Sequence, residues 1–134
     1  MTIEQTRALI EPYVRSHDPQ YLAEDAVFID TASGQRYEGR AAVAEMLHWV
    51  YHVAFDARAE DLKLIVGEGT AAVEGLFVGR HIGEFAGIPA TGRIVRVPLC
   101  VTYDVAEDGV KAARIYMQGT VLMVQLGVAE LSAA

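Results

Sequence analysis

Residues 78–105 read VGRHIGEFAGIPATGRIVRVPLCVTYDV. Two segments at 71–82 and 93–105 mix β-branched and aromatic residues with a period of two, which is typical of strands whose faces meet different surroundings. The GIPATG motif between them contains the glycines and proline that a turn requires. The pattern therefore predicts a long β-hairpin, and arms of this length favour a sheet that curls around a hollow.

The composition describes a small acidic protein with a substantial apolar content. Its 134 residues fit one domain, 1–134, which is long enough to bury a core. Hydrophobic residues make up 52%, yet no apolar run approaches the ~18 residues that would span a bilayer. We therefore expect the surplus apolar surface to line a pocket or a subunit interface. The net charge of −7 and the lack of a basic block exclude nucleic acid and anionic membranes as expected partners.

Motifs for metals, cofactors and export are absent from the sequence. Cys100 is the only cysteine, which excludes a disulfide framework and a cysteine-only metal site. His48 and His52 are four residues apart, but Trp49 occupies the position where a zinc-protease motif has glutamate. Phosphate-loop, dinucleotide and nucleophile motifs are also missing. We expect no metal and no cofactor, and the N-terminus MTIEQTR, which lacks signal-peptide features, predicts a cytoplasmic protein.

Helical and strand patterns alternate along the rest of the chain. Thr2 and Gln5 have the spacing of a capping box, which marks the start of a first helix. The expected elements are a helix at 3–15, a one-turn helix at 20–23, a strand at 26–30, a loop at 31–39, the main amphipathic helix at 40–55, a strand at 62–66, the hairpin, and a last strand at 110–126. Helices that precede an antiparallel meander predict an α+β fold with the sheet wrapped around the main helix.

Three segments resemble one protein family. They are GRHIGEFAGIPATGR in the hairpin, RIYMQGTVLMVQLG near the end, and DAVFID followed by GRAAV in the first half. Together they are similar to the SnoaL-like polyketide cyclases of the NTF2-like superfamily, over about residues 20–127. The resemblance implies a cone-shaped α+β barrel with an apolar pocket open at one end, packed as a homodimer through the outer face of its sheet.

The resemblance also implies a chemistry. Cyclases of this family close a ring by an intramolecular aldol reaction without metal or cofactor, and they use an aspartate that precedes a Gln-Leu-Gly motif by seven residues. In this chain that position is Gln118, because Gln125 begins the motif. A carboxamide does not exchange a proton at neutral pH, although it can hydrogen-bond a carbonyl group. Gln118 is either a residue that orients a substrate or a polar group satisfied by its neighbours.

The alternation of the last strand offers further candidates for substrate binding. If Gln118 faces inward, Tyr116 and Arg114 share its face and form a wall suited to a carbonyl or carboxylate group. The alternative for Arg114 is a position at the sheet edge, paired with an acidic residue. Arg80 and His81 are adjacent, so only one of them can point inward.

Ketosteroid isomerase, in the same superfamily, provides a second template. Its catalytic carboxylate is similar in context to Asp30, and its oxyanion tyrosine is similar to Tyr13, which precedes a valine in the first helix. Its second aspartate falls on Cys100 in this chain. Asp30 lies where this fold can bury a carboxylate against apolar walls, which is the setting of a general base. The alternative for Asp30 is to cap the loop at 31–34.

The remaining candidates are less specific. His48 or His52 could face the cavity and donate a proton, although a solvent-exposed helix face is the alternative for at least one of them. A lone buried cysteine such as Cys100 usually acts as a small hydrophobe. We therefore expect a cofactor-free enzyme that acts on a small, largely apolar carbonyl compound by ring closure, isomerisation or lyase chemistry. The alternative is a non-catalytic binding protein that retained the pocket.

Overall fold

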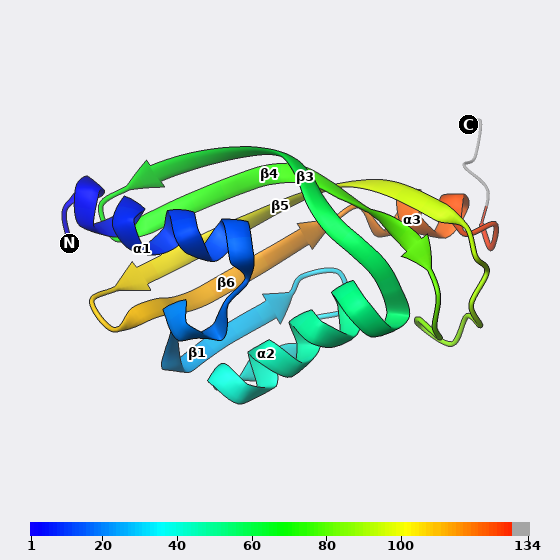
Figure 1. Cartoon of the computed structure of the whole chain (residues 1–134), viewed down its shortest axis with the longest axis horizontal. Helices are drawn as coiled ribbons and strands as arrows, with labels where there is room; N and C mark the ends of the chain where they lie inside the picture. Colours follow the sequence, from blue (N-terminus) through cyan, green and yellow to red (C-terminus); the bar gives the residue numbers. More distant parts are fainter. Residues whose placement is uncertain (130–134) are drawn as a thin grey trace.

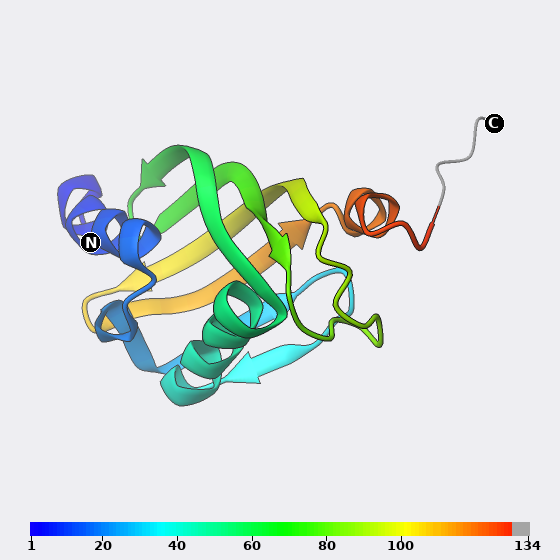
Figure 2. The same cartoon turned by 45° about the vertical axis from the view of Figure 1, so that its right-hand side comes forward.

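The computed structural model describes residues 1–129, so the end of the expected 1–134 domain lies outside the described residues. Its elements are α1 (Ile3–Ser16), η1 (Pro19–Tyr21), β1 (Leu22–Asp30), β2 (Arg36–Glu38), α2 (Arg40–His48), η2 (Trp49–Ala54), β3 (Phe55–Gly67), β4 (Thr70–His81), β5 (Ile94–Ala106), β6 (Gly109–Met117) and α3 (Gly119–Gln125). The strands form one sheet in the order β2-β1-β6-β5-β4-β3. Figures 1 and 2 show this sheet curving around α2, with α1 on the same side. The predicted α+β fold is confirmed, and the sheet remains unclosed, with β2 and β3 at its edges.

The predicted hairpin forms the longest run of pairing without a register shift among the described strands. Strands β4 and β5 pair antiparallel without a register shift, from Thr70↔Asp104 to Arg80↔Ile94. Gly87 lies in the connection with a φ of 78°, a conformation that glycine adopts without strain. Among the strands of residues 1–129, only β1 and β6 pair in parallel, and β6 in turn pairs with β5 of the hairpin.

Strand β3 is much longer than the predicted strand at 62–66. The missed part, 55–61, alternates charged residues outward with small alanines inward, so it carries little apolar signal. Between Glu60 and Lys63 the register shifts. A Cβ on Gly75 in the neighbouring strand would lie 2.7 Å from the Leu62 side chain. Because residue 75 is a glycine, the irregular part of β3 can approach β4 closely at this point. The Leu62 side chain then reaches the concave side of the sheet.

The predicted last strand at 110–126 is wrong in its second half. β6 ends at Met117, and the chain then forms α3. Leu122 and Leu126 are both buried and are four residues apart, which is helical spacing. The run VLMV reads equally well as a strand or as a helix, because short apolar runs do not distinguish the two.

The side chain of Gln125 attaches α3 to the sheet. β6 pairs with β5 only from Leu99 onward, so the earlier part of β5 has no strand on that side. The Gln125 carboxamide accepts a hydrogen bond from the Arg96 backbone N–H at 2.7 Å and donates one to the Arg96 carbonyl at 2.9 Å. A side chain thus replaces a neighbouring strand, which explains the glutamine of the Gln-Leu-Gly motif.

Helix α1 is anchored at its start and packs against the core further along. The predicted capping box of Thr2 and Gln5 is confirmed by both reciprocal hydrogen bonds. The Thr6 hydroxyl accepts a hydrogen bond from the Gly69 N–H at 2.9 Å, which joins α1 to the β3–β4 turn. About two turns further along the helix, Tyr13 is buried in the core. The anchoring therefore fixes the part of α1 that lies over the sheet.

The main helix covers nearly the predicted span of 40–55, but its second half is π-helical. The wider turns of a π-helix change which side chains face the sheet, and such segments are frequent at functional sites.

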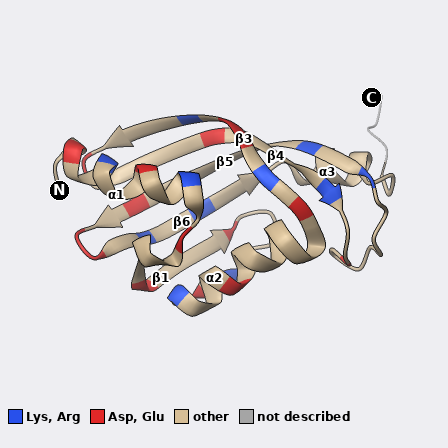
Figure 3. Ribbon diagram, viewed as in Figure 1, with Lys and Arg blue, Asp and Glu red and all other residues tan. Residues whose placement is uncertain are grey.

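None of the helices in residues 1–129 is long and apolar enough to cross a membrane. Figure 3 shows acidic and basic residues interspersed along the ribbon.

Candidate functional site

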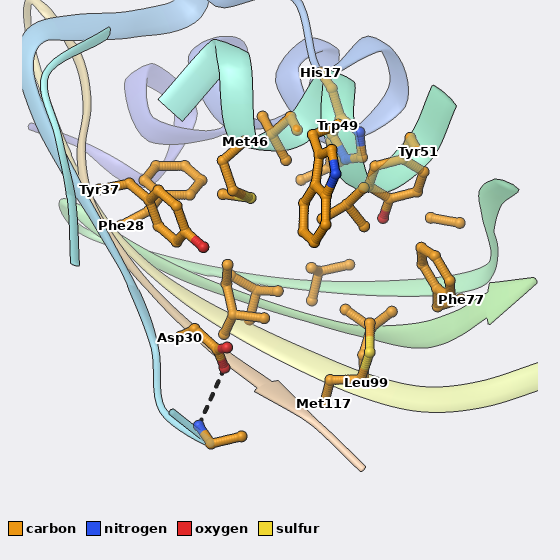
Figure 4. A pocket seen from close by; sticks show the side chains of 18 of the residues that line it. His17, Phe28, Asp30, Tyr37, Met46, Trp49, Tyr51, Phe77, Leu99 and Met117 are labelled. Carbon is orange, nitrogen blue, oxygen red and sulfur yellow. Dashed lines mark hydrogen bonds between the residues drawn. The ribbon is translucent and has the colours of Figure 1, made fainter. Parts of the chain in front are cut away.

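A cavity of about 260 Å³ lies between the concave face of the sheet and the helices. Its floor comes from inward-facing residues of β3 to β6, and its roof comes from the end of α1, from α2 and from η2. Most of the lining side chains are aliphatic or aromatic, and Figure 4 shows several of them. An apolar cavity with a few polar groups is the usual form of a small-molecule site.

Two buried tyrosines provide the most enclosed polar groups of the cavity. Tyr13 from α1 is 1% exposed and Tyr103 from β5 is 4% exposed. Their rings meet edge to face with centroids 5.9 Å apart, and Phe28 packs against both. Burial, followed by the neighbouring phenol groups, raises the pKa of both tyrosines well above the usual value. Both hydroxyls therefore keep their protons at neutral pH and can act as hydrogen-bond donors.

No side-chain hydrogen bond among residues 1–129 involves the hydroxyl of Tyr13 or Tyr103, and both residues line the cavity. Buried phenol hydroxyls usually find a partner, because an unpaired polar group in an apolar environment costs free energy. Both residues line the cavity, so a ligand oxygen can supply the missing acceptor. Tyr51 also lines the cavity, and burial raises its pKa to about 12.

Asp30 lies at the end of β1 and lines the cavity, as the sequence predicts for a candidate base. Its carboxylate also accepts hydrogen bonds from the Ala32 N–H at 3.1 Å and the Ser33 hydroxyl at 2.9 Å. The predicted cap of the 31–34 loop is therefore present as well. Burial, and then the charge of Asp30, raise the pKa of Tyr37, which lines the same end of the cavity.

His17 is a cavity residue that the sequence analysis did not identify. It follows the last turn of α1 in a left-handed conformation with φ of 53°. Its ring centroid lies 4.9 Å from that of Tyr51 and 5.6 Å from that of Tyr13. Burial, with a smaller contribution from His52, lowers the pKa of His17 from 6.5. The spacing of four residues from Tyr13 was the signal in the sequence, since it continues the buried stripe of α1.

An aromatic pair separates the cavity from solvent at the hairpin connection. Trp49 from η2 stacks on Phe85 with ring centroids 5.6 Å apart and an interplanar angle of 18°. Both residues line the cavity, and Trp49 is 37% exposed. Figure 4 shows the Trp49 ring standing in the middle of the lining residues. The stacked pair therefore sets the size of the cavity on this side.

The predicted wall of Arg114, Tyr116 and Gln118 inside the cavity is wrong. These three residues are exposed on the convex side, where Tyr116 and Gln118 line a separate shallow pocket. Arg114 lies 4.0 Å from the carboxylate of Asp104, which is the acidic partner of the predicted alternative, although β6 is an interior strand and not the sheet edge. The inward residues of β6 are the apolar set that includes Ile115 and Met117. The apolar character of Ile115 and Met117 was the signal in the sequence that indicates which face of β6 is buried.

Four other predicted substrate-binding residues also lie outside the cavity. Arg80 is exposed and donates a hydrogen bond to the Gly92 carbonyl at 2.7 Å. Cys100 lies at the shallow convex pocket, whereas His48 and His52 are exposed on an outer groove. The prediction that one of these histidines faces the cavity is therefore wrong.

The open question of orientation at the end of β4 is resolved in favour of His81, which is fully buried. Its Nδ1 accepts a hydrogen bond from the Thr91 N–H at 3.1 Å, which holds the hairpin connection.

Residues 1–129 contain no group of three His, Cys, Asp or Glu side chains suited to a metal ion. Exposed Ile65, Ile94 and Tyr116 lie on the convex face, and the expected homodimer through this face stays a prediction.

Solved structures with the same fold cover nearly all of the chain. A candidate polyketide cyclase from Xanthomonas campestris pv. campestris superposes with a TM-score of 0.81 at 18% identity, over 92% of this chain and 98% of that one. A phenazine biosynthesis-related protein from Pseudomonas aeruginosa gives 0.80 at 16% identity, over 98% and 86%. A candidate ketosteroid isomerase from Kribbella flavida gives 0.67 at 21% identity, over 87% and 81%. These similarities establish the fold.

No curated protein matches the sequence. The profile of the SnoaL-like polyketide cyclases matches residues 10–126, which is most of the chain. This range includes β1 with Asp30, the whole hairpin and α3, and therefore nearly every element around the cavity. The resemblance predicted from the sequence is confirmed, and the chain belongs to the SnoaL-like polyketide cyclase family.

Proposed function

We propose that this protein binds a small, largely apolar carbonyl compound in the cavity and catalyses proton transfer at the carbon next to the carbonyl group. No cofactor takes part in the proposed reaction. The observation that carries the proposal is the pair of buried phenol hydroxyls, Tyr13 and Tyr103, which have no partner among residues 1–129 and line an apolar cavity that also contains Asp30. The function links this chain to the chemistry of its family and of the isomerase-like neighbours.

Each residue has a defined role in the proposed reaction. The carbonyl oxygen of the substrate accepts hydrogen bonds from Tyr13 and Tyr103. The Asp30 carboxylate takes a proton from the adjacent carbon, and the electrons of the broken C–H bond form an enolate. The phenol donors stabilise the negative charge on the enolate oxygen, and such donors act strongly where water is excluded. The enolate then attacks a second carbonyl carbon in a ring closure, or receives a proton at another carbon in an isomerisation.

Gln118, which occupies the family's catalytic position in the sequence, has no part in this proposal. Its side chain is exposed at the start of α3. Of the catalytic residues that the sequence analysis predicted, Asp30 is therefore the one that serves as the proposed base. A non-catalytic binding protein is the second candidate, because the Asp30 carboxylate already accepts two hydrogen bonds from its own loop.

The cavity volume limits the size of the ligand. Pockets for drug-sized molecules span about 300–1,000 Å³, and this cavity has about 260 Å³. The expected ligand therefore has one or two fused rings. β-Tetralone, a two-ring ketone, is a suitable substrate probe, and β-naphthol resembles its enol and serves as a binding probe.

Removal of the Phe85 ring should widen the range of ligands. We expect Phe85→Ala to raise the affinity for the three-ring β-anthrol by at least about tenfold relative to β-naphthol, a scale typical of added apolar pocket volume. Fluorescence titration of both alcohols measures the ratio. Ile82→Ala is the control, because Ile82 is exposed near the same connection. An unchanged ratio in Phe85→Ala would show that the stacked pair does not limit ligand size.

Hydrogen–deuterium exchange on β-tetralone distinguishes an enzyme from a binding protein. The proposed enzyme incorporates deuterium from D₂O at the carbons next to the carbonyl group faster than buffer does, and NMR measures the rate. β-Naphthol should inhibit the exchange by competition. If β-naphthol binds while the exchange rate equals that of buffer, the binding protein is the correct function.

A further inference from the structure

A second hollow lies on the other side of the cavity wall. It is a groove of about 440 Å³ on the outer surface, bordered by the end of α1, by α2 with η2, and by β3. The side chains that line both the groove and the cavity are those of Val14, His17, Leu47, Tyr51, Ala59 and Leu62. The wall between the two hollows is therefore one side chain thick.

His17 is distinctive within this wall. The other shared residues are aliphatic, except for Tyr51, whose pKa is raised to about 12 and which therefore stays protonated at neutral pH. The His17 ring is held by aromatic contacts with Tyr13 and Tyr51. No hydrogen bond reaches the ring from any residue that the structure describes, and Figure 4 shows it on the far side of the cavity from Asp30.

A neutral imidazole has one acceptor nitrogen and one donor nitrogen. The phenol groups near His17 are donors, whereas the apolar part of the wall offers neither donors nor acceptors. We propose that His17 is a second polar anchor of the cavity and accepts a hydrogen bond from an acidic hydroxyl group of the ligand. The ligand class is then a carbonyl compound that also carries a phenol or enol hydroxyl. This inference rests on the proposed function, because it assumes that the carbonyl group occupies Tyr13 and Tyr103.

Burial, and to a smaller extent a neighbouring histidine, favour the neutral form of His17. His52 in η2 and His48 in α2 line the same groove, as do Arg15 of α1 and Arg58 of β3. The two arginines form ion pairs with Glu11 at 2.7 Å and Glu60 at 3.2 Å. Burial and His52 lower the pKa of His17 from 6.5. At neutral pH the ring therefore keeps its acceptor nitrogen, and the groove gives it a route for proton exchange with solvent.

Tetralones with a phenol hydroxyl at each ring position in turn provide the test. The best isomer should bind the wild-type protein at least about tenfold more tightly than β-tetralone, the scale of one hydrogen bond to a buried group. His17→Phe should remove this preference, so that the best isomer binds this variant no more tightly than β-tetralone does. His17→Asn is a second variant, because asparagine tolerates the left-handed backbone at this position. His52→Phe is the matched control and should keep the preference.

The pH dependence adds a readout that a packing role would not produce. The pKa of His17 is lowered from 6.5, mainly by burial, so the ring is protonated and loses its acceptor nitrogen only at acidic pH. The preference for the hydroxyl isomer should therefore be lost as the pH falls through the lowered pKa of His17. Equal affinity of the best isomer for the wild type and both His17 variants would overturn the inference while leaving the proposed function intact. Failure of every tetralone to bind would overturn both.

Discussion

Replacement of both Tyr13 and Tyr103 by phenylalanine is expected to reduce the rate of deuterium exchange on β-tetralone by about a thousandfold or more. Loss of a single donor to a developing oxyanion typically costs about 10²–10³ in rate, and here two donors are lost. The free energy of unfolding should stay the same or rise, because each tyrosine is buried and its hydroxyl, which faces the cavity, makes no hydrogen bond within the described residues. NMR exchange rates and urea unfolding measure the two effects.

Tyr116→Phe is the matched control for this double variant. Tyr116 is 45% exposed on the convex face, so its hydroxyl should affect neither rate nor stability. A double variant that retains wild-type exchange rates would show that the two phenols do not hold the reacting oxygen. A large loss of stability would show that the hydroxyls bond within the protein.

Asp30→Asn is expected to reduce the exchange rate by at least about a hundredfold, the usual scale of general base catalysis. Asparagine can still accept the hydrogen bond from the Ala32 N–H, so the loop at 31–34 should keep its conformation. Binding of β-naphthol should therefore persist, and fluorescence titration measures it. Asp30→Asn therefore tests whether this residue is required for catalysis but not for ligand binding.

Gln118→Asp is the complementary variant, because it places an acid where the sequence resemblance predicts the aspartate of the family. Gln118 is exposed and lies outside the cavity, so this change should add no exchange activity. A gain of activity in Gln118→Asp, together with wild-type rates in Asp30→Asn, would assign the chemistry to the convex pocket instead.

The sequence predicted those parts of the fold in which local pattern and long-range pairing agree. The hairpin of β4 and β5 is an example, because its alternation, its turn chemistry and its pairing partner all lie within one continuous stretch. The capping box of α1 depends only on residues three positions apart. The family was also recognisable, since its motifs lie in the same hairpin and in β6 with α3.

The errors arose where the outcome depends on distant contacts. The segment after Met117 becomes α3 because Gln125 and two leucines find partners on β5 and in the core, which the local pattern does not encode. The inward face of β6 was assigned from one family position, although the apolar residues Ile115 and Met117 indicated the opposite face.

The candidate site was only partly predictable for the same reason. Tyr13 and Asp30 were identified because their sequence contexts resemble those of the oxyanion tyrosine and the catalytic carboxylate of ketosteroid isomerase. Tyr103 continues the alternation of inward valines in β5 and was available from that pattern. His17 enters the cavity only because α1 ends in a left-handed turn over η2, and its contact with Tyr51 joins residues far apart in the chain.

The central claim is that the interior cavity, and not the convex pocket, is the functional site. NMR of the protein labelled with ¹³C-tyrosine, during titration with β-naphthol, tests this claim most directly, because tyrosines line both the cavity and the convex pocket. We expect the ring signals of Tyr13 and Tyr103 to shift with saturation, while those of Tyr116 stay fixed. Saturable shifts of Tyr116 with unchanged Tyr13 and Tyr103 signals would contradict the claim.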